Sequence, residues 1–269
     1  MANEKILISE RSQKRTIVRI GRETLSFSTI SDDGIQFNHY NVKQGISMAA
    51  NLRAAIKEGE WIDNGNGGTV IVDGDVLLVP QDSYDENLAQ DMYMHCFPKK
   101  NGYVVFHNAL PDMGVVVLFG LNKDLRTVVT NNMSGAKFVA AMAPVWTHLY
   151  HKSYNGNRQK LYAYFHENRM DIFAFGNKRF KFCNNFSVTE VSDSVYFLLY
   201  VWREMGLSQE DDELNLVGNI PQKGEIMEEL EYYIKRCFVI NPRTDFNRAT
   251  ATAIEEMPYD LMAYYVKSR

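Results

Sequence analysis

Cysteine is scarce in this chain, and the few cysteines present cannot build a disulfide framework. The 269 residues include only Cys96, Cys183 and Cys237, an odd number spaced far apart. They lack the local pairing that zinc and redox motifs show, so we expect three reduced thiols, each a small core residue. Free thiols are typical of a reducing compartment, and the sequence therefore predicts a cytoplasmic location.

Long hydrophobic runs are also missing. The longest, such as residues 114–121, fall well short of the roughly 20 residues that a membrane helix requires. The apolar stretch at residues 6–8 is too short for the core of a signal peptide. We therefore expect neither a membrane segment nor an export signal.

Neither sign of charge dominates the chain. Twenty-nine basic and 33 acidic side chains leave a net charge of -4, which provides no uniform field to attract nucleic acid or an anionic membrane. One local exception is the stretch Lys178–Phe182, where basic and aromatic residues alternate as they do in single-strand binding surfaces. A strand with aromatics facing inward and cations outward produces the same alternation, and the sequence favours that interpretation.

Alternating apolar residues and turn signals predict the same order of elements twice. Each half begins with three short strands joined by tight turns and continues with an amphipathic helix and a further strand. The predicted elements of the first half are strands at 17–20, 25–27 and 35–37, a helix at 46–59 and a strand or strand pair at 69–79. Those of the second half are strands at 161–165, 169–175 and 180–186, a helix at 187–205, a buried strand at 214–218, another helix, and a strand at 237–240.

The predicted helix at 187–205 has the clearest boundaries. Ser187 and Glu190 fit the S-x-x-E capping box at its start, and Gly206 is a natural stop. Trp202 falls on its apolar stripe, so we expect a buried indole. Pro144 is placed as the first residue of an earlier helix.

The polar connection at residues 151–159 contains a central glycine and separates the two halves. Between them, a hairpin within residues 102–119 and a strand at 136–141 are assigned to the first half. The predicted organisation is an N-terminal domain at 1–156 and a C-terminal domain at 157–269, each with a mixed sheet flanked by helices.

This duplicated unit resembles the RNase H-like fold of the actin-like ATPases, which include actin, sugar kinases, heat-shock-70 chaperones and pilus-assembly proteins of the PilM kind. More closely, the stretches TVIVDGDVLLVP (69–80), LYAYFHENRMDIFAFGNKRFKFCNNF (161–186) and ELNLVGNIP (213–221) resemble the bacterial family DUF3822, whose function is unknown. The resemblance implies an α/β fold with a cleft between two halves.

The nucleotide motifs of active actin-like ATPases are only partly present. Their first hairpin turn carries Asp-x-Gly-[Thr/Ser], whose aspartate organises magnesium, but Arg19 stands at that position and only Gly21 matches. Their second turn needs a glycine that lets the backbone approach phosphate, and residues 166–169 contain none. Gly218 alone remains of the glycines that would face a purine. The resemblance therefore implies that ATP hydrolysis has been lost.

Three functions stay open from the sequence. The favoured one is a non-catalytic interaction or scaffold protein with a protein partner, in which a homo-oligomer is also conceivable. The alternative is a nucleotide-binding, ATPase-like or kinase-like protein that uses unorthodox contacts, namely Gly21, Arg22, Arg169, Gly218 and Asn219. The third is an RNA-associated accessory protein that binds through the basic strand at 178–181. The favoured function needs no cofactor, and only the alternative would use ATP.

No motif for covalent or metal chemistry stands out. His148 and His151 are three residues apart on a predicted helix, but no third ligand follows at a recognisable spacing. The glycine-rich segment 65–69 precedes a strand, whereas a phosphate cradle must open a helix. We therefore expect neither catalytic residues nor a metal site.

Overall fold

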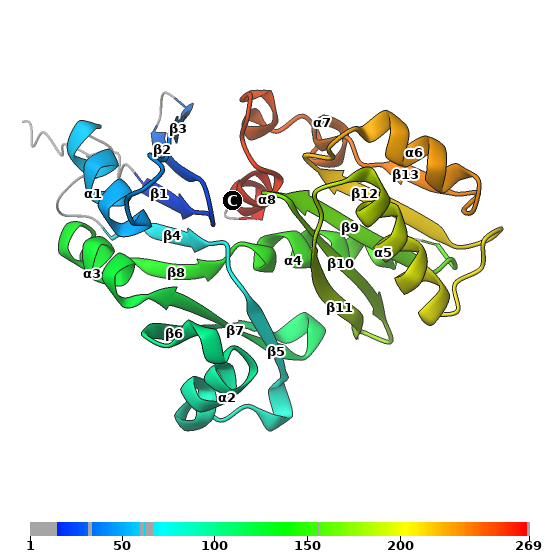
Figure 1. The fold of residues 1–269 in the computed structure, drawn as a ribbon, viewed down its shortest axis with the longest axis horizontal. Helices are drawn as coiled ribbons and strands as arrows, with labels where there is room; N and C mark the ends of the chain where they lie inside the picture. The colour runs from blue at the N-terminus through cyan, green and yellow to red at the C-terminus, as the bar shows by residue number, and fades with distance from the viewer. Residues whose placement is uncertain (1–14, 32–33, 60–61, 63–66, 155, 268–269) are drawn as a thin grey trace, which may run out of the picture.

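The computed structural model describes residues 15–31, 34–59, 62, 67–154 and 156–267. Two five-stranded sheets dominate it, and both have the same strand order. In each sheet three antiparallel strands come first in the chain, and two later strands join in parallel beside the first of them. Figure 1 shows the two sheets on either side of a central pair of helices, α4 and α8.

The first sheet confirms the predicted meander. Its order is β3-β2-β1-β4-β8, and its strands are β1 (Arg15–Ile20), β2 (Leu25–Ser31), β3 (Gly34–Tyr40), β4 (Thr69–Val72) and β8 (Lys137–Ala140). The predicted turn between β2 and β3 involves Asp32 and Asp33, which lie outside the described residues.

The stretch expected to form one bent strand or a tight pair at 69–79 is in fact divided between two sheets. After β4 the chain passes through Asp73–Asp75 and enters a separate antiparallel sheet of order β5-β7-β6. We call this three-stranded sheet the inserted sheet. Its strands are β5 (Val76–Pro80), β6 (Tyr103–Leu110) and β7 (Val115–Asn122), and α2 (Ala89–Cys96) packs against it. The predicted hairpin of 102–119 is confirmed as β6 and β7.

The second sheet has the order β11-β10-β9-β12-β13. Its strands are β9 (Lys160–His166), β10 (Arg169–Gly176), β11 (Arg179–Ser187), β12 (Glu213–Gly218) and β13 (Cys237–Val239). Alternate residues of β9 serve two cores. Leu161, Ala163 and Phe165 pack with the outer helices, and Tyr162 and Tyr164 pack toward the first sheet.

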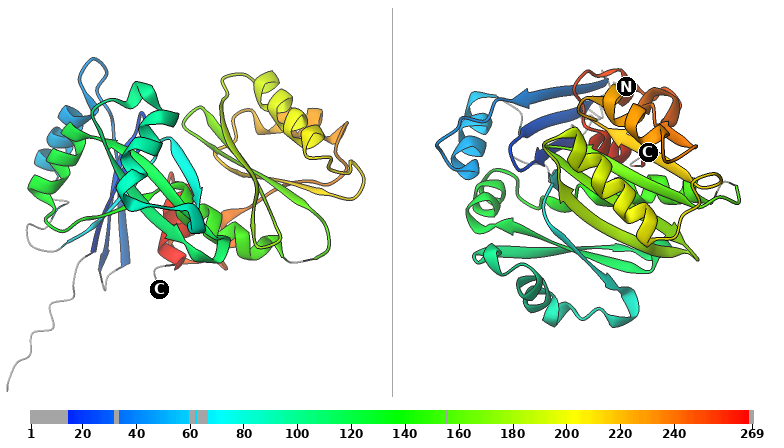
Figure 2. Two further views of the ribbon diagram at one scale, coloured as in Figure 1. Left: turned by 90° about the horizontal axis from the view of Figure 1, so that it is seen from below. Right: turned by 45° about the vertical axis from the view of Figure 1, so that its right-hand side comes forward.

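Helices cover both sheets and fill the space between them. α1 and α3 lie on the outer face of the first sheet, α5 and α6 on that of the second, and α4 and α8 between the two (Figure 2). Their bounds, with the short α7, are α1 (Met48–Glu58), α3 (Lys123–Asn132), α4 (Met142–Ser153), α5 (Val191–Glu204), α6 (Lys223–Glu231), α7 (Pro242–Asp245) and α8 (Tyr259–Lys267). The described residues also form the 3-10 turns η1 (Gln81–Ser83), η2 (Glu86–Leu88), η3 (Pro98–Lys100), η4 (Pro111–Met113) and η5 (Thr250–Ala253).

The helix α8 returns from the end of the chain to the first sheet. Tyr265 donates a hydrogen bond to Ser28 of β2, and Tyr264 lies 2.8 Å from the hydroxyl of Thr69 on β4. The division of the chain at residues 156 and 157 remains a prediction, because the two sheets share the core that contains α4 and α8.

Local sequence reasoning was wrong at two helix starts. Ser187 is the last residue of β11, so the capping box of α5 is formed by Glu190 and Asp193 and not by Ser187 and Glu190. Pro144 is the third residue of α4, which begins at Met142. The stop at Gly206 is confirmed, because its φ of 64° allows the chain to leave α5 in the left-handed conformation.

Two side-chain placements also differ from expectation. Phe180 was expected on the same strand face as Phe182, but the pairing of β10 with β11 shifts so that Lys181 is an extra residue. This bulge turns Phe180 toward Trp146 in the central core, while Phe182 packs under the outer helices. Cys96, expected in the core, is exposed at the end of α2.

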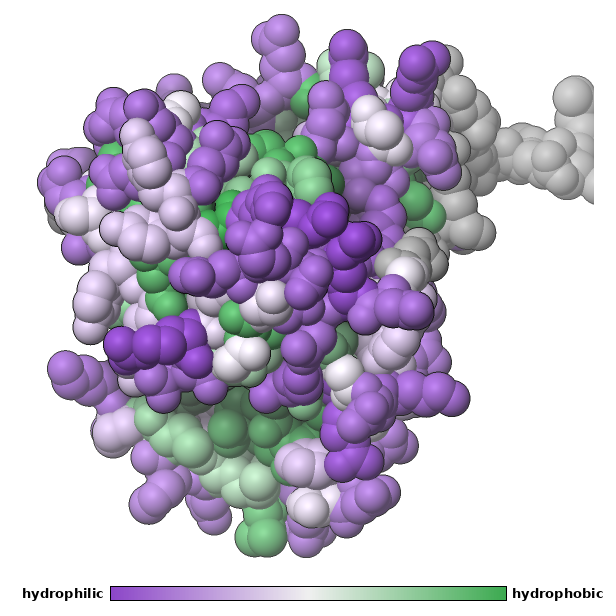
Figure 3. Space-filling model, turned by 90° about the vertical axis from the view of Figure 1, so that its right-hand side faces the viewer, coloured by the Kyte–Doolittle hydropathy of each residue, from purple (hydrophilic) through white to green (hydrophobic). Residues whose placement is uncertain are grey.

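The surface of the second half is mostly hydrophilic. Seen from that side, apolar residues gather in a hollow low on the molecule, level with the inserted sheet (Figure 3). Within the described residues, none of the helices combines the length and the apolar character that a bilayer-spanning segment requires.

Candidate functional site

The first hairpin turns of the two halves meet in the middle of the molecule. The turn between β1 and β2 consists of residues 21–24, and the turn between β9 and β10 has Glu167 and Asn168 at its tip. Both of these tip residues have positive φ, at 43° and 57°, as in a tight type I′ hairpin. In active actin-like ATPases these are the two turns that hold phosphate, so their contacts define the candidate site.

The carboxylate of Glu167 lies inside the first turn. Its Oε2 accepts hydrogen bonds from the backbone amides of Arg22 at 2.7 Å and Glu23 at 3.0 Å. Its Oε1 accepts from Arg19 Nη1 at 2.7 Å and from the hydroxyl of Thr24. Paired amides, a hydroxyl and a guanidinium form a receptor for an anion, and a carboxylate of the same chain already occupies it.

Gly21 makes this close approach possible. A Cβ atom at Gly21 would lie 2.1 Å from Oε1 of Glu167, well inside the distance at which real atoms pack. Gly21, which matches the glycine of the phosphate-binding turn in active members of the fold, therefore leaves room for the side chain of Glu167.

Arg19 is the centre of a buried ion-pair network. It is only 2% exposed, and its guanidinium contacts three carboxylates. Nε and Nη2 donate to Asp260 of α8 at 2.8–3.0 Å, Nη2 also donates to Asp73 at 3.0 Å, and Nη1 donates to Glu167. Three segments that are far apart in the sequence are thus joined to β1 by one side chain.

His166 extends the network from the second half. Its Nδ1 lies 2.8 Å from Asp73 and its Nε2 lies 2.6 Å from Asp171, so each ring nitrogen faces a carboxylate. Burial disfavours the charged imidazolium, but the charges and hydrogen bonds of Asp73 and Asp171 outweigh it and raise the pKa of His166 to about 10. Burial also opposes the charge of Asp73, yet His166, Arg19 and Arg169 hold its pKa far below the usual range.

The protonation of His166 predicts how stability depends on pH. Because its pKa is raised in the folded state, its contribution is complete below the unfolded value of 6.5 and is lost as pH rises toward 10. We expect the free energy of unfolding to fall between pH 6.5 and 9 with a slope of up to about 1.4 kcal/mol per pH unit, the value for one proton. Urea denaturation at pH 6, 7.5 and 9 measures this slope.

Two variants separate His166 from other groups that titrate in this range. His166→Gln should remove most of the decline, whereas His39→Gln, at an exposed position on β3, should leave it unchanged. A wild-type protein whose stability is flat from pH 6.5 to 9 would contradict a protonated His166, even if the His166→Gln protein did not fold.

Arg169 is buried beside the network but incompletely paired. It is 5% exposed, and its guanidinium lies 3.7 Å from Asp73 and 3.9 Å from Asp171, beyond hydrogen-bond distance. Its Nε and Nη1 have no hydrogen-bond partner among the described residues. Such nitrogens normally find an acceptor, so this side of the network can take up another polar group.

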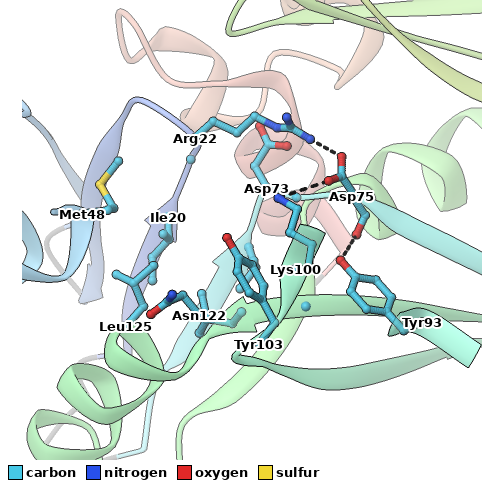
Figure 4. A pocket seen from close by; sticks show the side chains of 15 residues that line it. Ile20, Arg22, Met48, Asp73, Asp75, Tyr93, Lys100, Tyr103, Asn122 and Leu125 are labelled. Carbon is cyan, nitrogen blue, oxygen red and sulfur yellow. Dashed lines mark hydrogen bonds and ion pairs between the residues drawn. The ribbon is translucent and has the colours of Figure 1, made fainter. Parts of the chain in front are cut away.

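A pocket of about 290 Å³ opens beside the first turn, between the first sheet and the inserted sheet. At one end Arg22 and Lys100 both pair with Asp75, and Ile20, Met48 and Leu125 form an apolar lining at the other (Figure 4). Burial opposes the charge of Asp75, but the two cations lower its pKa. The pocket is at the small end of ligand sites and fits an apolar side chain or a small polar molecule.

Comparison with known proteins places the chain in a family. The family model described as "Protein of unknown function (DUF3822)" matches residues 3–237. The chain belongs to the DUF3822 family. Among solved structures, this DUF3822 protein is similar to a Bacteroides thetaiotaomicron protein "with actin-like ATPase fold and unknown function", with 25% identity, a TM-score of 0.79, and coverage of 93% of this chain and 100% of the other.

A second similar structure is a chain of the "PilM-PilN type IV pilus biogenesis complex", with 11% identity, a TM-score of 0.51, and coverage of 94% of this chain and 96% of the other. At that identity the likeness concerns the fold alone. No curated protein matches the chain. The predicted actin-like ATPase fold and DUF3822 membership are confirmed, and the DUF3822 assignment itself carries no activity.

The structure brings together only some of the residues suggested for a nucleotide. Gly21 and Arg22 line the pocket of Figure 4, and Arg169 lies close enough for its charge to lower the pKa of Asp75. Gly218 and Asn219 do not line that pocket. Gly218 packs so tightly on β9 that a Cβ would lie 2.3 Å from the carbonyl of Phe165, and the amide of Asn219 donates to the same carbonyl.

Other suggested chemistry finds no support in the described residues. No group of three His, Cys, Asp or Glu side chains there could hold a metal ion. Of the two histidines on α4, His148 lies 2.7 Å from Asp245, and His151 is exposed. Asp245 also accepts hydrogen bonds from Lys152 and Tyr259, so this cluster joins α4 to α7 and α8.

The acidic members of the network are not among the predicted site residues, although the sequence contains a signal for them. Arg19 and Asp171 each interrupt a run of buried apolar residues within a strand, and Asp73 follows one directly. A charged residue at a core position requires a partner of opposite charge. That pattern identifies candidates for a buried ion-pair network but not which of them pair.

Proposed function

We propose that this DUF3822 protein is an interaction protein that has kept the actin-like fold but does not hydrolyse ATP. The observation that carries the proposal is the carboxylate of Glu167 in the first turn. It uses the amides of Arg22 and Glu23 and the hydroxyl of Thr24, the groups that would face a phosphate. An incoming phosphate would have to displace it and break its ion pair with Arg19.

The site also offers poor support for a metal ion bound with a nucleotide. Arg19 stands where active members carry the magnesium-organising aspartate. The nearby carboxylates of Asp73 and Asp171 already pair with His166, so a cation would compete with side chains that are fixed by burial. These contacts favour a structural role for the cleft, in which it holds the two halves together, and disfavour a catalytic role.

A protein partner is supported by the fold and by the surface. PilM has this fold and is found in a complex with PilN, so the fold can serve protein assembly. Several large side chains of the present chain are exposed on the second half, including Tyr196, Tyr232 and Tyr233. Clusters of exposed aromatic residues are typical of protein interfaces.

Nucleotide binding is the second candidate, and one observation favours it. Nε and Nη1 of Arg169 have no hydrogen-bond partner among the described residues, and Arg22 lines the neighbouring pocket, so two cations could receive an anionic group. Two observations oppose it: Glu167 occupies the phosphate turn, and neither Gly218 nor Asn219 lines the pocket.

Calorimetric titration with ATP and magnesium tests the proposal. We expect the wild-type protein to bind ATP with a dissociation constant weaker than about 100 μM, equivalent to less than about 5.5 kcal/mol of binding free energy. An ATP affinity tighter than this, or ATP hydrolysis by the purified protein, would overturn the proposal in favour of the second candidate.

A pair of variants tests the part that Glu167 plays. Glu167→Ala frees the two amides, and we expect it to bind inorganic phosphate more tightly than the wild type does, still without hydrolysing ATP. Glu23→Ala removes an exposed carboxylate of the same turn and leaves Glu167 in place, so its phosphate affinity should match the wild type. Equal phosphate affinity of the wild type and both variants would show that Glu167 does not block phosphate binding at the first turn.

A further inference from the structure

An aromatic groove lies along α5 and is closed on one side by Tyr233, which follows α6. Its volume is about 770 Å³, and its apolar lining consists of Tyr196, Leu199, Tyr200, Trp202, Leu207 and Tyr233. We call it the tyrosine groove. It lies on the side of the second sheet away from the ion-pair network, because α5 packs on the outer core.

The tyrosines of the groove are exposed to an unusual degree. Tyr196, Tyr200 and Tyr233 have 62%, 43% and 52% of their surface accessible. Tyr196 and Tyr200 are one helical turn apart, and their rings stack with centroids 6.2 Å apart. Rigid aromatic rings held in a hollow offer a large contact area with little conformational entropy left to lose, as at the centre of protein interfaces.

Trp202 adds an unused hydrogen-bond donor. It lines the groove and is 3% exposed, and its indole Nε1 has no acceptor among the described residues. A buried N–H without an acceptor is destabilising, and a ligand that supplies the acceptor removes that cost. The groove therefore contains both an apolar surface and a polar group that lacks a partner within this chain.

Negative charge is concentrated in the stretch of chain that includes α6, the helix that packs against α5. Residues 203–236, which run from the end of α5 past α6, contain nine acidic and four basic side chains, whereas the rest of the chain contains 24 acidic and 25 basic ones. Glu225, Glu228, Glu229 and Glu231 are exposed on α6 and form no ion pair with the described residues. This potential repels nucleic acid and anionic lipid and attracts cations.

The groove also shows how a cation would bind there. The guanidinium of Arg203 lies 5.7 Å from the centroid of the Tyr200 ring, within the range of a cation–π contact. Arg203 is highly exposed, so a lysine or arginine of another protein could take the same position over the ring.

We propose that the tyrosine groove binds a basic segment of a partner protein, with aliphatic anchors between the tyrosine rings and lysine or arginine side chains directed toward the exposed carboxylates of the neighbouring helix α6. This rests on the proposed function as an interaction protein and names the surface and the partner's chemistry. The charge decides between occupants, since an acidic or neutral segment would gain nothing from the exposed carboxylates of α6.

Selection from a displayed library of random 16-residue peptides tests the groove with the full chain. The bait is the wild-type protein, and the selected peptides are then measured against two variants. Tyr196→Ser combined with Tyr200→Ser empties the groove, whereas Tyr232→Ser removes a neighbouring tyrosine that is 79% exposed but does not line it. Circular dichroism and thermal melting verify that both variants fold.

We expect the selected peptides to be rich in Lys or Arg and in Leu or Ile. Their affinity should fall at least tenfold on the groove variant, stay unchanged on Tyr232→Ser, and weaken as sodium chloride rises from 50 to 500 mM. Neutral or acidic peptides, equal binding to the groove variant, or no enrichment would each overturn this proposal. None of these results bears on ATP binding, so the failure of the groove and the failure of the proposed function are distinguishable.

Discussion

Replacing Arg19 with methionine is expected to lower the free energy of unfolding by about 3 to 5 kcal/mol, the usual cost of removing one partner from a buried ion pair. Methionine has a volume similar to that of arginine, so the expected loss of stability comes from removing the positive charge. Asp260, Asp73 and Glu167 would lose the cation that all three contact, in surroundings where Arg19 and Asp260 are 2% and 0% exposed. Urea denaturation at pH 7 measures the change.

Arg22→Met is the matched control, because it makes the same substitution three residues further along, in the turn that follows β1. Arg22 is over one-third exposed and pairs with Asp75 near the surface, where an ion pair contributes about 0 to 1 kcal/mol. Arg19→Lys should lie between the two, since it keeps the charge but loses the fork that grips Asp260. Equal effects of Arg19→Met and Arg22→Met would contradict the central position of Arg19.

Trp202→Ala is expected to cost about 3 to 5 kcal/mol through lost burial and an unfilled cavity in the outer core. The indole packs among Leu198, Val201 and the neighbouring helix α6, and only 3% of its surface is accessible. Thermal and urea denaturation both report this loss, which is a large part of the stability of an ordinary domain.

Two substitutions on the same helix sharpen the test. Trp202→Phe keeps a ring and removes the unpaired N–H, so it should cost less than half as much as alanine does. Tyr196→Ala, at a position with 62% of its surface accessible, should change stability by roughly 0.5 kcal/mol or less. If Trp202→Ala cost no more than Tyr196→Ala, the packing of α5 on the second sheet would be wrong.

The sequence predicted the order of strands and helices well, because each element depends mainly on its own apolar period. The three strands of each half and the buried position of Trp202 follow directly from that period. The errors arose where pairing with another strand decides the structure. Ser187 pairs with Arg169 in the sheet and so cannot cap α5, and the bulge at Lys181 reverses the side on which Phe180 lies.

The candidate site could be predicted only in part. The sequence shows that Arg19 stands where active actin-like ATPases carry the metal-organising aspartate. The structure places Arg19 on β1, next to the first turn. Its contact with Asp260 bridges 241 positions, and no local pattern links two residues at that separation. Nor could the sequence show that Glu167, rather than solvent, fills the first turn, because that depends on how closely the two hairpins approach.

The return of α8 to the first sheet reverses the order in which the two halves can mature during synthesis. The strands of the second sheet all come from residues 160–239, so that sheet is complete in the growing chain before α8 has been translated. The first sheet emerges earlier, but Arg19 and Ser28 must wait for Asp260 and Tyr265. Until α8 is in place, Arg19 lacks Asp260, one of the three carboxylates that it contacts in the complete protein. The half that is made first is therefore the half that finishes folding last.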